Sequence, residues 1–143
     1  MRGEARAVAS GDHPVTDPLR LLDTGALLTY AEQSSPLVGY EIIKCEESQR
    51  TLLVSAACLA EAYELASDDG VHLLDALVNL EPIRVEPVNP DDARVTGLVA
   101  RRVGRLGLAH TCMLAMASAL QVMTTDADAA LKVLEESMVK RLD

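Results

Sequence analysis

Short runs of apolar residues alternate along the chain with longer stretches in which apolar positions recur every three or four residues. Short continuous runs are typical of buried strands, and the longer spacing is typical of helices that pack on one face. The pattern predicts buried strands at residues 21–22, 51–54 and 122–123, and a strand exposed on one face at residues 83–86. It predicts helices over residues 26–32, 36–49, 56–66, 71–80, 90–105, 108–120 and 127–136.

Turn-forming and capping residues separate these elements. Ser55 is a candidate N-cap for the helix that follows it, and Pro36 and Pro90 suit the first turn of a helix. The polar segment 67–70 predicts a clear break between two helices. Because strands alternate with helices, we expect an α/β fold with a short central parallel sheet and helices on both faces. In such a sheet a functional site lies at the carboxyl ends of the strands.

The length of 143 residues fits a single domain, which we place at residues 19–143. Residues 1–18 are rich in Gly, Pro, Ala and charge without a sustained period, so we expect a flexible N-terminal tail. The chain has no Phe or Trp and only three tyrosines, which argues against base stacking on an aromatic platform.

Charge and cysteine usage narrow the class of protein further. A net charge of −9 argues against a generic nucleic-acid coat protein, but a metal-dependent nuclease remains compatible because bound cations invert the local field. Cys45, Cys58 and Cys112 are odd in number and widely spaced, so we expect buried thiols. No run approaches the roughly 18 apolar residues of a membrane span, and we expect a cytoplasmic protein without a membrane segment.

Acidic residues stand where the predicted sheet places a site. Asp23 ends the first predicted strand, Asp126 ends the last, and Glu61 lies about two turns into the helix after the second strand. Carboxylates that meet from separate segments repel one another unless a cation joins them, so Mg²⁺ or Mn²⁺ is the expected cofactor. Taken singly, Asp23 could be only a turn former, Glu61 a solvated helix residue, and Asp126 or Asp128 a helix cap.

Four segments of the chain resemble the PIN domain family, in particular the VapC-like toxin ribonucleases. They are Leu-Leu-Asp-Thr-Gly-Ala-Leu at 21–27, the stretch 55–64 around Glu61, the apolar run 106–117, and Met-Thr-Thr-Asp at 123–126. With the spacing between them, these segments cover residues 19–136. The resemblance implies metal-dependent cleavage of RNA, with Asp23, Glu61 and Asp126 as catalytic metal ligands and Asp128 assisting.

The chain departs from the family pattern at the third acid, which family members carry at the head of the buried helix. One alignment places His110 there, and another places Leu108. A neutral His110 is a softer ligand that favours Mn²⁺ or Zn²⁺ over Mg²⁺, or it only bonds a backbone carbonyl. If Leu108 is the equivalent, the site lacks one ligand. The alternative function is a catalytically impaired PIN-like domain that acts as a binding or regulatory module.

The resemblance also implies supporting residues and partners. Thr124 and Thr125 directly follow the last predicted strand. In the family the first of them helps to orient the site, and the alternative role for both residues is strand packing and helix capping. Arginines of the helix 90–105 could grip an RNA backbone or form a solvated face. An antitoxin protein and a homodimer are expected partners, held by the helices 26–32 and 36–49. Their apolar residues, which we expect to be mostly core, include Tyr30, Leu37, Tyr40 and Ile43.

Overall fold

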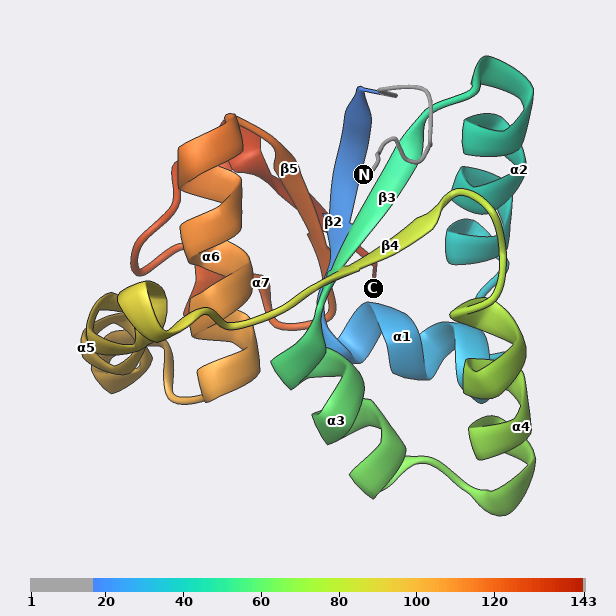
Figure 1. Cartoon of the computed structure of the whole chain (residues 1–143), viewed down its shortest axis with the longest axis horizontal. Coiled ribbons are helices and arrows are strands. Elements are labelled where there is room, and N and C mark those ends of the chain that lie inside the picture. Colours follow the sequence, from blue (N-terminus) through green and yellow to red (C-terminus); the bar gives the residue numbers. More distant parts are fainter. Residues whose placement is uncertain (1–16, 143) are drawn as a thin grey trace.

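Five short parallel strands form one sheet at the centre of the fold (Figure 1). The computed structural model describes residues 17–142, so residues 1–16 of the predicted tail lie outside the described part. In chain order the strands are β2 (Pro18–Leu22), β3 (Thr51–Ser55), β4 (Ile83–Glu86), β5 (Gln121–Thr124) and β6 (Val139–Arg141). The order across the sheet is β4-β3-β2-β5-β6, and every neighbouring pair is parallel.

Helices cover both faces of this sheet, which confirms the predicted α/β class (Figure 1). One layer contains α1 (Thr24–Ala31), α2 (Leu37–Ser48), α3 (Ala56–Leu65) and α4 (Asp68–Leu77). The other contains α5 (Ala93–Val103), α6 (Leu106–Ser118) and α7 (Ala127–Ala130). Within β2, Leu21 packs into the second layer and Leu22 into the first, because successive side chains of a strand point to opposite faces. Parallel strands buried on both faces therefore appear as continuous apolar runs.

Polar side chains cap the helices that follow the strands. The Ser55 hydroxyl accepts hydrogen bonds from the amides of Ala57 and Cys58, which confirms the predicted N-cap of α3. The predicted break between these helices is present but shorter than residues 67–70, because only Ala66 and Ser67 separate α3 from α4. Ser67 caps α4, and the helix begins at Asp68, where two acids in the first turn complement the helix dipole.

The C-terminal prediction was also wrong in part. Helix α7 ends at Ala130 rather than extending to residue 136, and a short 3-10 turn (Glu136–Met138) leads into β6. Strand β6 has only three residues, too few to display an alternating pattern, and it is defined by its pairing with β5. A 3-10 turn (Pro90–Asp92) likewise replaces the first turn of the predicted helix 90–105, and α5 ends at Val103.

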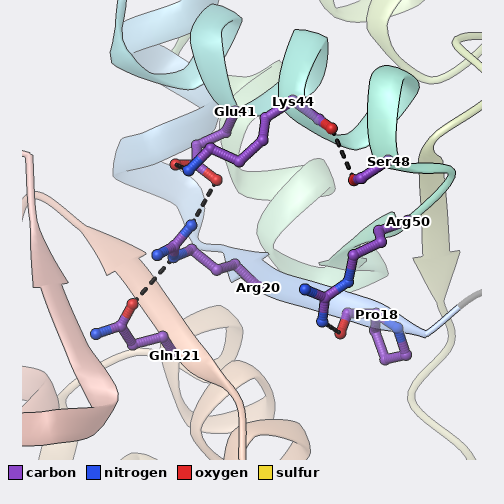
Figure 2. Close-up of polar contacts among 7 residues, drawn as sticks. All are labelled: Pro18, Arg20, Glu41, Lys44, Ser48, Arg50 and Gln121. Atoms are coloured by element: carbon purple, nitrogen blue, oxygen red, sulfur yellow. Dashed lines mark hydrogen bonds and ion pairs between the residues drawn. The ribbon is translucent and has the colours of Figure 1, made fainter.

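A polar network ties β2 to α2 and β5 away from the carboxyl ends of the strands (Figure 2). The Arg20 guanidinium donates to Glu41 Oε2 at 2.6 Å and to Gln121 Oε1 at 3.0 Å. The side chains of Arg20 and Glu41 are only 18% and 7% exposed. In the same region Arg50 donates to the carbonyl of Pro18 at 3.1 Å. These contacts fix the first strand between elements that are distant in sequence.

The expectation that the apolar residues of α2 are mostly core was wrong for three of them. Leu37, Tyr40 and Ile43 are 39%, 62% and 51% exposed, whereas Tyr30 of α1 is half-buried against the first core layer. The three exposed residues recur at helical spacing, so α2 presents an apolar strip outside the fold. Within residues 17–142, no helix has the length and apolar character needed to cross a membrane.

Candidate acidic site at the carboxyl ends of the strands

Asp23 lies directly after β2 and caps α1. Its Oδ1 accepts a hydrogen bond from the Ala26 amide at 2.8 Å. The residue is fully buried, and its Oδ2 has no hydrogen-bond partner. Burial raises the pKa of this carboxyl above its ordinary value, and the guanidinium of Arg105 opposes the rise. The Thr124 hydroxyl also lies close enough to oppose it, although it makes no hydrogen bond of standard geometry to Oδ2. Asp23 therefore holds a buried carboxylate oxygen that a proton or a cation could satisfy.

Asp126 follows β5 after one intervening residue and is close enough to Asp23 to raise the pKa of that carboxyl further. Its amide donates to Thr124 Oγ1 at 2.8 Å, and its Oδ1 accepts from the Ala129 amide at 3.3 Å. Thr124 is fully buried and fixes the strand end. The Asp126 side chain is 47% exposed, so this carboxylate faces solvent while its backbone is held in place.

Glu61 reaches the same region from α3. Its Oε1 accepts from the Thr24 hydroxyl at 2.7 Å, and its Oε2 accepts from the Gly107 amide at 3.4 Å. Thr24 is the neighbour of Asp23 in the chain, so this hydrogen bond brings the two acids together. Burial raises the pKa of the nearby Cys58 to about 11, and the charges of Asp23 and Glu61 add to that rise. The three predicted acids therefore lie at the same edge of the sheet, but within residues 17–142 they do not form one group that could hold a metal ion.

Two glycines permit close contacts at this edge. A Cβ atom on Gly25 would overlap Thr125 Oγ1, and one on Gly107 would overlap Glu61 Oε1. Gly25 thus allows the turn after β2 to approach the exposed Thr125 in the turn after β5. Gly107 allows the start of α6 to approach Glu61. The close approach of these two glycines to side chains across the site is visible only in the tertiary structure.

Replacing Gly107 with alanine is expected to lower the free energy of unfolding by about 1–3 kcal/mol through overpacking. The new Cβ would also lie 3.0 Å from the buried sulfur of Cys58, so a shift of Glu61 alone would not relieve the contact. Gly97→Ala is the matched control, because a Cβ added at this position of α5 would meet nothing within 4 Å. The control should raise stability by about 0.5–1 kcal/mol through helix propensity. Urea unfolding measures the free energy of unfolding of both variants. Equal changes in the two would contradict the close approach of Gly107 to Glu61.

The residues considered for the missing third acid supply no carboxylate. His110 is fully buried, and its Nδ1 shares a 2.8 Å hydrogen bond with Ser55 Oγ, a hydroxyl rather than the backbone carbonyl considered from sequence. Its Nε2 has no partner. Burial lowers the pKa of His110, opposed by Asp92 and Glu86, so the ring is neutral at pH 7.

The remaining candidates differ in exposure. Leu108 is buried in the second core layer and contributes no polar atom to the site. Asp128 is exposed in the first turn of α7, two residues beyond Asp126. The third position of the family pattern therefore carries no carboxylate under either alignment, and the acidic site consists of Asp23, Glu61 and Asp126.

A cation at this edge of the sheet would have few protein ligands. Within residues 17–142, no three His, Cys, Asp or Glu side chains lie close enough together to hold one metal ion. Mg²⁺ commonly keeps several waters and binds one or two carboxylates together with substrate phosphates. The unpartnered Oδ2 of Asp23 and the half-exposed carboxylate of Asp126 fit that requirement. Glu61 lies beside them with its Oε1 already engaged by Thr24.

A comparison of the sequence with models of protein families and with curated proteins gave no match.

Proposed function

We propose that the chain is a metal-dependent ribonuclease of the PIN type, resembling VapC-like toxins, that hydrolyses RNA phosphodiesters at a Mg²⁺ or Mn²⁺ site. One observation carries the proposal: the Oδ2 of Asp23 is buried at the carboxyl end of β2 without a hydrogen-bond partner. A buried carboxylate oxygen left unsatisfied is costly unless a proton or a cation completes it. The neighbouring charge of Asp126 adds to the cost of an ionised Asp23, a cost that a bound cation would relieve for both carboxylates.

The residues of the site have separable tasks in this mechanism. Asp23 and Asp126 would hold the ion, which when bound polarises the phosphodiester and lowers the pKa of an attacking water. Glu61 is oriented by the Thr24 hydroxyl at Oε1, while its Oε2 contact with the Gly107 amide is long at 3.4 Å. Oε2 is therefore the oxygen that remains available to accept a proton from water. Thr124 holds the Asp126 backbone through its hydroxyl.

The surface around the site adds a means of holding RNA. Helix α5 contains Arg94, Arg101 and Arg102 and no acidic residue, although the whole chain carries a net charge of −9. All three side chains are exposed. A cationic helix that leads toward the acidic edge would attract the phosphate backbone irrespective of base sequence.

A cytoplasmic location and an antitoxin or second copy bound at the apolar strip of α2 belong to the same proposal.

The proposal is tested by incubating structured RNA with the purified chain in Mn²⁺ or in EDTA. Cleavage should require the metal, and Asp126→Asn should lower it at least about tenfold because one of two ion ligands loses its charge. Asp128→Asn is the matched control, since its carboxylate is exposed two residues further on and should change the rate less than about twofold. RNA cleavage that persists in EDTA would refute the mechanism. Equal cleavage rates of the wild type, Asp126→Asn and Asp128→Asn would refute it as well.

A second candidate is a PIN-like module with impaired catalysis, as the missing third acid suggests. The observation that favours it is the ion pair between Arg105 and Asp126, which gives this carboxylate a partner within the chain. Calorimetric titration with Mn²⁺ separates the two functions. Saturable binding that disappears in Asp126→Asn favours the enzyme, and RNA binding without metal binding favours the module.

A further inference from the structure

Arg105 occupies a distinctive position between the two helices that lead to the site. Helix α5 ends at Val103, Gly104 adopts a φ of +96°, and Arg105 is the residue directly before α6. Because a left-handed conformation favours glycine, Gly104 sets the direction in which the chain continues to Arg105. The sequence pattern placed Arg105 inside the helix 90–105, on a solvated or RNA-facing side. It instead turns toward the strand ends.

One guanidinium faces the half-exposed aspartate after β5. Arg105 Nη2 lies 3.6 Å from Asp126 Oδ2. Arginine stays protonated at every pH of interest, so this positive charge is permanent. Arg105 therefore compensates part of the negative charge of the acidic site when no other cation is bound.

The pair with Asp126 is also loosely held. At 3.6 Å it is longer than a charge-assisted hydrogen bond, and the two side chains are 39% and 47% exposed. Exposed ion pairs of this kind contribute little to stability, and the long arginine side chain can adopt other rotamers. Arg105 can consequently leave Asp126 without disrupting the fold.

We propose that Arg105 is a positioning residue that competes with the divalent ion for the Asp126 carboxylate. Arg105 leaves that carboxylate when a substrate phosphate arrives. The inference rests on the proposed metal-dependent function. An ion at Asp23 and Asp126 meets repulsion from the guanidinium, whereas a phosphate offers that guanidinium a new anionic partner. Phosphate binding then frees Asp126 for the ion. Because linkage is reciprocal, the ion and the RNA backbone strengthen each other's binding.

The test is a calorimetric Mn²⁺ titration of the full chain and its variants in the absence of RNA. Arg105→Gln should bind Mn²⁺ about fivefold more tightly, because a nearby repelling charge is removed. Arg105→Lys should stay close to the wild-type affinity, since it keeps the charge. Arg102→Gln is the matched control for net charge and should change the affinity less than about twofold, because its exposed side chain belongs to α5.

A second titration adds a short single-stranded oligodeoxynucleotide as a phosphate backbone without the 2′-hydroxyl. It should tighten Mn²⁺ binding several-fold in the wild type and leave Arg105→Gln unchanged. Thermal melting verifies that each variant is folded. Equal Mn²⁺ affinities of Arg105→Gln and Arg102→Gln, weaker binding in Arg105→Gln, or no binding in any protein would overturn the inference. A chain that binds Mn²⁺ but leaves RNA intact would refute the ribonuclease alone, because the Arg105 comparison stands without cleavage.

Discussion

Replacing Asp23 with asparagine is expected to lower metal-dependent RNA cleavage by about 100-fold or more while leaving the metal-free protein at least as stable as the wild type. Asparagine keeps an oxygen that can accept from the Ala26 amide, so the N-cap of α1 remains. It removes the negative charge that a divalent ion requires. RNA cleavage assays in Mn²⁺ measure the first effect, and equal activity of the variant would end the proposed mechanism.

The expected stability of the metal-free Asp23→Asn variant follows from the raised pKa of Asp23. Burial favours the protonated carboxyl, so its stabilising contribution is complete below the unfolded value of 3.8 and is lost as pH rises through the raised folded value. At pH 7 an ionised Asp23 is therefore a cost to the metal-free fold, which the neutral asparagine avoids.

Thermal melting at pH 7 with and without Mn²⁺ measures this second effect. The wild type should gain stability on adding the ion, and Asp23→Asn should gain none. Asp23→Ala is the informative comparison, since it also removes the charge but loses the cap, which should make it about 1 kcal/mol less stable than Asp23→Asn. A metal-free Asp23→Asn variant that is as unstable as Asp23→Ala would show that the carboxylate serves only the turn.

Replacing Glu41 with alanine is expected to lower the free energy of unfolding by about 2–3 kcal/mol, because it leaves the nearly buried Arg20 without its anionic partner. Gln121 alone would then face the guanidinium (Figure 2). Urea unfolding measures the change. Glu47→Ala is the matched control, because this exposed residue lies on the same helix and should stay within about 0.5 kcal/mol of the wild type.

A double variant tests whether the loss of stability in Glu41→Ala comes from the unpaired charge of Arg20. Replacing Arg20 with methionine in the Glu41→Ala background removes both ionic groups, and apolar replacement of a buried pair is often close to neutral. The double variant should therefore recover most of the stability. A double variant less stable than Glu41→Ala would show that packing of the Arg20 stem, and not its charge, dominates this region.

Local sequence predicted correctly the strands that are buried on both faces and the helix α3, whose N-cap lies directly before it. The apolar runs at residues 21–22, 51–54 and 122–123 all lie in strands, because a parallel sheet covered on both sides needs apolar residues at successive positions. Ser55 caps α3 through its own hydroxyl, a contact that spans only three residues. The break predicted at residues 67–70 was too long, because Ser, Asp and Gly suit both a loop and the first turn of a helix.

By itself, then, the sequence determined the alternation of strands and helices and placed Asp23 and Asp126 after two of the strands. Only the tertiary structure decided that these two strands are neighbours in the sheet and which side chains meet at that edge. The hydrogen bond between Thr24 and Glu61 joins residues 37 positions apart, and that between Ser55 and His110 joins residues 55 positions apart. Such contacts depend on how helices pack and on which rotamers that packing permits, and no local periodicity encodes them.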